Sequence, residues 1–76
     1  MSLHAYMLVE TNRDAVEFVR EARKLPGVVA AHALFGSLDA IVMVEAPDMS
    51  GLEEIVGQVH RVPGLKSGDT RIARSA

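Results

Sequence analysis

The chain contains no cysteine and no tryptophan, and its 76 residues include only two phenylalanines and one tyrosine. Without cysteine, a disulfide framework, a thiol nucleophile and a zinc–thiolate site are all excluded. The lack of cysteine also fits a reducing compartment, so we expect a cytoplasmic protein. So few aromatic rings make a platform for stacking nucleic-acid bases improbable.

An excess of charge of one sign is also missing. Eight Lys and Arg residues are interspersed with ten Asp and Glu residues, for a formal net charge of −2. No basic cluster could follow a phosphate backbone, so we predict no direct binding to DNA or RNA. No apolar run approaches the roughly 18 residues of a membrane span, and the N-terminus lacks the pattern of a signal peptide. We therefore expect no membrane partner.

Hydrophobic residues, in contrast, are abundant for so small a domain, at 49% of the chain. A single domain of this size buries only about 60% of the surface that its unfolded chain exposes, so its own core is marginal. Disulfides cannot compensate for the small core, because the chain has no cysteine. Association with further copies of the chain is the remaining way to bury more apolar surface, and the composition favours it.

A repeated segment organises the chain. Residues 24–28 read Lys-Leu-Pro-Gly-Val and residues 61–65 read Arg-Val-Pro-Gly-Leu, a period of 37 residues. Before each segment, apolar residues recur at i, i+3, i+4, i+7 and i+10, which is typical of one face of a helix. They are Ala15, Phe18, Val19, Ala22 and Leu25 in the first unit and Leu52, Ile55, Val56, Val59 and Val62 in the second. The pattern predicts two strand–helix–strand units, with each helix ended by Pro-Gly.

The predicted elements follow from this repeat. We expect strands over residues 3–10, 28–35, 39–46 and 65–73, a first helix from the N-cap Thr11 to about Lys24, and a second from Ser50 to Pro63. Asp14 and Glu53 stand three residues after these caps, as in a capping box. With right-handed crossovers the order βαββαβ gives an α+β, ferredoxin-like sandwich, an antiparallel sheet with two helices on one face. Residues 1–76 are expected to form this single domain.

Two of the expected strands are apolar on both faces. Residues 40–44 read Ala-Ile-Val-Met-Val and residues 28–31 read Val-Val-Ala-Ala. Two helices can cover only one face of the sheet, so the strands should otherwise alternate apolar and polar residues. A large uncovered apolar face is unusual on a monomer. We therefore predict a homodimer in which the sheet of one copy covers the sheet of another.

Residues for catalysis or metal binding do not form a recognisable motif. His4, His32 and His60 lack the i, i+3 or i+4 spacing of a helical ligand pair, and we predict neither a metal site nor a cofactor. No serine stands in a Gly-x-Ser-x-Gly context, and no glycine-rich phosphate loop is present. Glu10 and Glu45 end similar strands and are expected to face solvent.

The turn Gly36-Ser37-Leu38-Asp39 is the exception, because it places a carboxylate at the start of an apolar strand. The Asp39 carboxylate could cap the backbone of the turn, which is the common structural role of aspartate there. Alternatively, it could meet the ammonium group of a ligand. The residues alone leave both interpretations open.

The order of these motifs resembles the effector-binding domain of the Lrp/AsnC family, also called the regulation of amino-acid metabolism (RAM) domain. The matching stretches are Ala5-Tyr6-Met7-Leu8-Val9, Leu25-Pro26-Gly27-Val28, Gly36-Ser37-Leu38-Asp39 and Val62-Pro63-Gly64-Leu65-Lys66-Ser67, which together span almost the whole chain. The regulators of this family carry an N-terminal helix-turn-helix that this sequence does not show. The resemblance therefore implies a stand-alone version of the domain, which is not an enzyme.

The resemblance also implies a mode of assembly and a binding site. Dimers joined through their sheets would assemble into a higher oligomer, and small effectors, usually amino acids, would bind between dimers near the turn. Carried over by position, the ligand-binding residues are Gly36, Ser37, Leu38 and Asp39 of the turn and Thr70 of the last strand. Leu38 departs from the family, which often has an aromatic residue there. The implied partners are full-length Lrp/AsnC regulators, through which the chain would modulate transcription.

Two other functions share this topology. One is a small dimeric enzyme of the ferredoxin-like barrel type, a cofactor-free oxygenase that uses a histidine in its cleft. The other is an ACT-type module, which also binds amino acids. The position of the site separates the three: between dimers for the Lrp/AsnC type, in an enclosed polar pocket of each protomer for the enzyme, and at a helix-edge interface for the ACT type.

Overall fold

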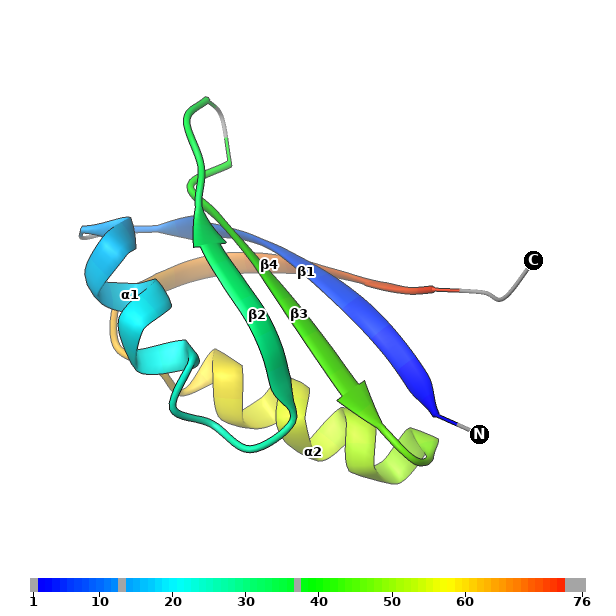
Figure 1. Ribbon diagram of the computed structural model, residues 1–76. Coiled ribbons are helices and arrows are strands. Elements are labelled where there is room, and N and C mark those ends of the chain that lie inside the picture. The colour runs from blue at the N-terminus through cyan, green and yellow to red at the C-terminus, as the bar shows by residue number, and fades with distance from the viewer. Residues whose placement is uncertain (1, 13, 37, 74–76) are drawn as a thin grey trace.

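The computed structural model describes residues 2–12, 14–36 and 38–73 and shows a four-stranded sheet with two helices (Figure 1). The elements are β1 (Leu3–Thr11), α1 (Ala15–Ala22), β2 (Val28–Ala33), β3 (Ala40–Ala46), α2 (Met49–His60) and β4 (Leu65–Ile72). This order confirms the predicted βαββαβ arrangement. The boundaries differ from the expected ones by a few residues, mostly at α1, which runs only from Ala15 to Ala22, and at β2, which ends at Ala33.

The sheet has the strand order β2-β3-β1-β4, and all its neighbouring strands are antiparallel. Both helices pack on the same face of the sheet, so the opposite face is bare in a single copy (Figure 1). This is the ferredoxin-like α+β fold. The two central strands, β1 and β3, lie between the edge strands β2 and β4. The N- and C-terminal halves of the chain therefore interleave.

The core lies between the sheet and the helices. Strands β1 and β3 turn alternate residues towards it, as Met7 and Val42 illustrate, because side chains alternate between the faces of a strand. The helices contribute the residues that their 3.6-residue spacing predicts: Phe18, Val19 and Ala22 from α1, and Leu52 and Val59 from α2. No polar or charged residue is buried in the part of the chain that the structure describes.

The helix starts differ from the sequence prediction. Asp14, rather than Thr11, is the N-cap of α1, and its carboxylate accepts a hydrogen bond from the Val16 amide at 2.9 Å. Asp48, rather than Ser50, is the N-cap of α2, and it accepts from the Gly51 amide at 2.8 Å. In both cases an aspartate next to the helix is available, and a carboxylate at the positive end of the helix dipole is favourable.

The Pro-Gly segments end the helices as predicted. Gly27 and Gly64 both have a positive φ, at +91° and +101°, where a residue with a side chain would be strained. Gly27 also lies against the side chain of Ile55 on α2, so that a Cβ atom at this position would clash with it. The first turn after α1 is therefore fitted to the second helix, and it links the two repeated units.

The bare face of the sheet carries a central group of apolar side chains. Ile41 and Met43 of β3 lie on this face, because their neighbours Val42 and Val44 point into the core. Leu8 pairs with Ile41 and Tyr6 with Met43 in the adjacent strand β1, so these side chains lie on the same face. The structure thus confirms that β3 is apolar on both faces.

Candidate functional site

The hairpin between β2 and β3 holds the predicted turn residues. The Leu34 amide donates a hydrogen bond to the Asp39 carbonyl at 2.7 Å, and the Asp39 amide donates to the Val9 carbonyl at 3.0 Å. These bonds close the hairpin and attach it to β1. Gly36 has a φ of +116°, and a Cβ atom there would meet open space. Ser37, the second predicted ligand-binding residue, lies outside the described residues.

The Asp39 side chain has a backbone partner. One of its carboxylate oxygens, Oδ2, accepts a hydrogen bond from the Thr11 amide at 2.9 Å, and the residue is half-buried. Backbone capping is one of the two roles of Asp39 that the sequence left open. Here, however, the carboxylate caps the end of β1 rather than the turn itself. This contact fixes the carboxylate at the base of the projecting hairpin, where the preceding residue, Leu38, is half-buried.

Thr70 is separate from the turn within one copy. It lies on β4, where it pairs with Met7 and therefore faces the helices. Strand β1 stands between β3 and β4, and Thr70 lies three residues further along the strands than Asp39. At ordinary strand spacing this puts the two Cα atoms about 14 Å apart. Within one copy the predicted residues thus form two separate groups. A single site with both groups needs the turn of one copy and Thr70 of another.

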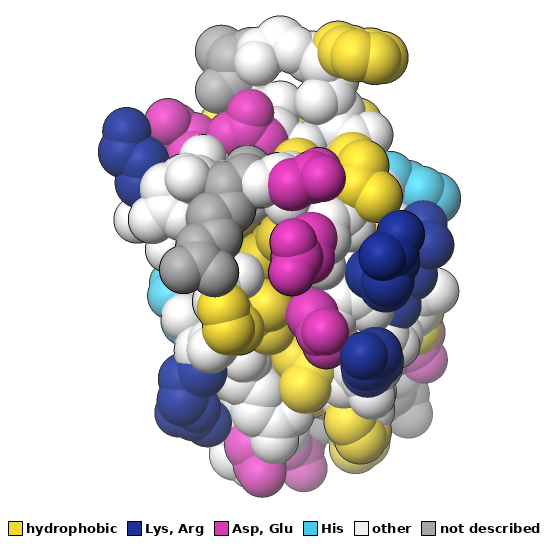
Figure 2. Space-filling view, turned by 90° about the vertical axis from the view of Figure 1, so that its left-hand side faces the viewer, with side chains coloured by type: hydrophobic (Ala, Val, Ile, Leu, Met, Phe, Trp, Pro, Cys, Tyr) yellow, Lys and Arg dark blue, Asp and Glu magenta, His cyan; other side chains and the backbone are white. Residues whose placement is uncertain are grey.

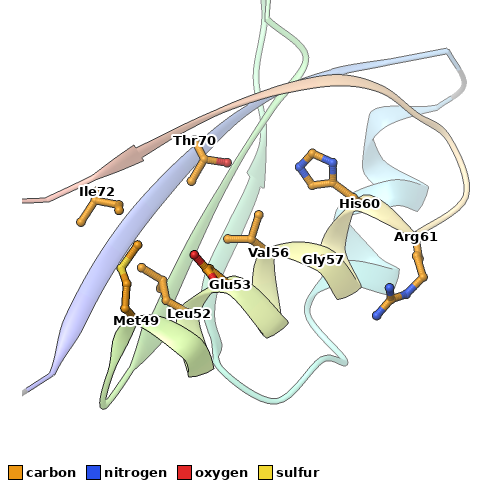
Figure 3. Close-up of a pocket in the computed structure, with 9 residues that line it drawn as sticks. All are labelled: Met49, Leu52, Glu53, Val56, Gly57, His60, Arg61, Thr70 and Ile72. Carbon is orange, nitrogen blue, oxygen red and sulfur yellow. The ribbon is translucent and has the colours of Figure 1, made fainter.

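Thr70 lies in a groove between α2 and β4, which we call the α2–β4 groove (Figure 3). Its volume is about 470 Å³, and its lining is mainly apolar. The lining residues are Met49, Leu52, Glu53, Val56, Gly57, His60 and Arg61 of α2 and Thr70 and Ile72 of β4. In Figure 3 the His60 imidazole points towards β4, whereas the Arg61 side chain is directed away from Thr70.

The groove was not predicted from the sequence, although the sequence contains one signal for it. Met49, Glu53, Val56 and His60 recur at helical spacing and mark a second stripe on α2, beside the buried stripe that contains Leu52. Met49 and Ile72 are each 44% exposed, so apolar surface remains uncovered at one end of the groove. Helix spacing alone does not show that this stripe faces β4.

Charged side chains surround the bare face of the sheet. The His4 Nε2 atom lies 2.9 Å from a Glu45 carboxylate oxygen across β1 and β3, and Arg71 forms an ion pair with Asp69 at 2.8 Å on β4. The hydrogen bonds from Arg71 lower the pKa of the Asp69 carboxyl, and the same contact raises the pKa of Arg71. The central apolar residues of this face are therefore bordered by charges of both signs.

The described residues contain no group of three or more His, Cys, Asp or Glu side chains that could hold a metal ion. None of the helices in the described ranges is long and apolar enough to cross a membrane. His4, His32 and His60 are all exposed, and they lie on β1, β2 and α2 as predicted.

A model of the Lrp/AsnC ligand-binding domain matches residues 4–76. The chain belongs to the Lrp/AsnC family. No curated protein sequence matches it. The family match, rather than the position of the groove, decides between the domain types that share this topology, because the α2–β4 groove lies at the edge of the helix layer, where an ACT-type interface would also lie.

Solved structures support this Lrp/AsnC assignment. Hypothetical protein PHS023 from Pyrococcus horikoshii is 26% identical, with a TM-score of 0.85 over 100% of this chain and 93% of its own. The transcriptional regulator NMB0573 from Neisseria meningitidis, solved as a complex with L-Met, is 25% identical, with a TM-score of 0.80 over 96% of this chain and 50% of its own. AsnC of E. coli shares the fold at 13% identity, with a TM-score of 0.84 over 97% of this chain and 52% of its own.

The 76 residues thus correspond to about half the length of each of these two regulators. The shared half is the ligand-binding domain, and NMB0573, which contains it, is a transcriptional regulator. The family match favours a ligand-binding module over the oxygenase alternative.

Proposed function

We propose that this protein is a cytoplasmic, oligomeric sensor that binds an amino acid and modulates transcription through full-length Lrp/AsnC regulators. The observation that carries the proposal is the match of residues 4–76 to a ligand-binding domain, one relative of which was solved with L-Met. Residues 1–76 act as one domain in this proposal. Because the chain has ten acidic and eight basic residues, any effect on DNA requires a partner with a helix-turn-helix.

The effector site combines the turn of one copy with β4 of another. An amino acid presents an ammonium group and a carboxylate. The Asp39 carboxylate pairs with the ammonium, and backbone amides of the turn from Gly36 to Leu38 bind the ligand carboxylate. Gly36 supports this role, because the absence of a Cβ atom keeps the space next to the turn open for the ligand. Thr70, about 14 Å away within one copy, supplies its hydroxyl from a neighbouring copy.

The first level of assembly is a dimer through the bare sheet faces. Tyr6, Leu8, Ile41 and Met43 form its apolar centre, and the charged residues around them form a polar rim. Burial of a few hundred Å² of apolar surface at about 25 cal/mol/Å² contributes several kcal/mol, which is comparable with the whole stability of a small domain. Such dimers assemble further and bring the turn of one copy to β4 of the next.

Native mass spectrometry with a panel of the twenty amino acids tests this function, because it reports assembly and binding together. We expect one or a few amino acids to bind to an oligomer and to shift its distribution of sizes. Titration calorimetry with the selected amino acid then gives the stoichiometry. If no amino acid binds while the chain is folded and oligomeric, the proposed sensor function is wrong.

A further inference from the structure

The hairpin between β2 and β3 ends in a large apolar side chain with no cover. Phe35 is fully exposed, and its neighbour Leu34 is 41% exposed. The hairpin projects beyond the body of the molecule, and hydrophobic atoms stand at its outer end in the space-filling view (Figures 1 and 2). An aromatic ring buries about 150–250 Å² when it is covered, so leaving this one in water is costly.

The α2–β4 groove is a concave, mainly apolar surface of the kind that an aromatic side chain occupies. Its volume is about 470 Å³, and its lining includes Met49, Leu52, Val56 and Ile72. Methionine is flexible and polarisable, and it packs well against an aromatic ring. The 44% exposure of Met49 and Ile72 shows that the groove, like Phe35, has apolar surface left to bury.

Phe35 cannot reach the groove of its own copy. The hairpin continues from β2, at one edge of the sheet, whereas the groove lies under β4, at the other edge. Three strand spacings, or about 14 Å, separate these edges, and the hairpin points away from the sheet (Figure 1). The Leu34–Asp39 hydrogen bond at 2.7 Å and the Asp39–Val9 bond at 3.0 Å hold the hairpin base in place.

We propose that Phe35 of one copy occupies the α2–β4 groove of a second copy. Each copy then has one projecting Phe35 and one groove, so the copies associate head to tail. When they close into a ring, every Phe35 and every groove has a partner. The contact lies outside the bare sheet face, so sheet-paired dimers can form it simultaneously. The contact bears on the proposed function in one respect. It brings the turn that follows Phe35 close to Thr70 of the neighbouring copy, where the proposed effector site lies, and only this role of the contact rests on the proposed function.

Sedimentation velocity without any effector tests the contact. We expect Phe35→Ser to weaken association between dimers by about tenfold to a hundredfold, as for a buried aromatic anchor, and to leave dimers intact. Gly57→Leu fills the groove and should have the same effect. A Cβ atom at Gly57 meets only the Arg61 Nη1 atom, at 3.9 Å, so this variant should fold. Val16→Ser is the control, because Val16 is an exposed apolar residue of α1 that belongs neither to the hairpin nor to the groove lining.

A cross-link gives a readout that does not depend on stability. Since the chain has no cysteine, a Leu34→Cys copy mixed with a Gly57→Cys copy should form a disulfide between positions 34 and 57 on oxidation. Wild-type chains that remain dimeric at all concentrations, or Phe35→Ser chains that assemble normally, would overturn the proposal. So would a Gly57→Leu variant that assembles normally but loses the effector, since the groove would then be a ligand pocket. Assembly without amino-acid binding would refute only the proposed function.

Discussion

At the scale of single residues, Asp39 has two possible tasks that substitution can separate. Its Oδ2 atom accepts from the Thr11 amide at 2.9 Å, and its negative charge is the feature that we assign to the effector ammonium. Asparagine retains an acceptor oxygen for Thr11 but loses the charge. The Thr11 contact accordingly survives in Asp39→Asn, whereas the charge-assisted contact does not.

We therefore expect Asp39→Asn to bind the effector about tenfold to a hundredfold more weakly, since a hydrogen bond to a charged group contributes roughly 1.5–3 kcal/mol. Titration calorimetry measures this loss, and sedimentation should show an unchanged oligomer. Asp39→Ala also removes the acceptor and should lower the free energy of unfolding. Normal effector binding by Asp39→Asn would assign Asp39 to the backbone contact alone and place the ligand elsewhere.

The caps of α2 provide a second test at this scale. Asp48 accepts from the Gly51 amide at 2.8 Å, while the Ser50 hydroxyl only donates to the Asp48 carboxylate at 3.1 Å. Asp48→Ala should reduce the free energy of unfolding by about 1 kcal/mol, the usual cost of a lost N-cap. Ser50→Ala should reduce it by much less. Urea unfolding at one protein concentration compares the two variants. A larger loss of unfolding free energy for Ser50→Ala than for Asp48→Ala would show that Ser50 is the N-cap, as the sequence predicts.

At the scale of secondary-structure elements, the repeated Pro-Gly segments do more than end helices. Gly27 follows α1 and lies against Ile55 of α2, and the Glu45 amide of β3 donates to the Gly27 carbonyl at 2.9 Å. One turn therefore contacts both the second helix and a central strand. The first repeated unit is fixed to the second at this point.

This contact predicts unequal effects of two glycine substitutions. Gly27 and Gly36 both have positive φ angles, so alanine at either position should cost about 1–3 kcal/mol through backbone strain. A Cβ atom at Gly27 also clashes with Ile55, whereas one at Gly36 meets open space. Gly27→Ala should therefore lose a further ~1–3 kcal/mol from overpacking. Thermal or urea unfolding of both variants measures the difference, and equal losses would contradict the tight contact between the first turn and α2.

At the scale of the whole molecule, the central question is what covers the bare sheet face. A charged substitution at its apolar centre distinguishes an interface from a free surface, because an unpaired charge in a buried interface costs several kcal/mol. Met43 is half-buried on this face, and Val16 is an exposed apolar residue on α1. Lysine at the two positions thus makes a matched pair.

We expect Met43→Lys to dissociate the dimer into monomers at micromolar concentration and to lower the unfolding temperature. Val16→Lys should leave both unchanged. Sedimentation equilibrium gives the dissociation constants of the two variants and of the wild-type chain. A wild-type protein that is a folded monomer at micromolar concentration would refute the sheet dimer, whatever the variants do.

The sequence by itself determined the elements, their order and the family. Two apolar helix faces, two Pro-Gly ends and strands that are apolar on both faces are local patterns, and local periodicity specifies which side of an element is buried. The same patterns, in their order along the chain, carried the resemblance to the Lrp/AsnC domain that the match over residues 4–76 confirmed. The capping residues were assigned less well, since Thr11 and Asp14, or Asp48 and Ser50, are local competitors for one role.

Only the tertiary structure decided how distant residues meet. The crossovers insert β1 between β3 and β4, which attaches Asp39 to Thr11, 28 residues away along the chain, and separates Asp39 from Thr70. The α2–β4 groove likewise exists because α2 leaves part of the edge strand uncovered. Sequence spacing carries no direct information on either point, because the order of strands in a sheet depends on the path of the connections and not on the period of any single element.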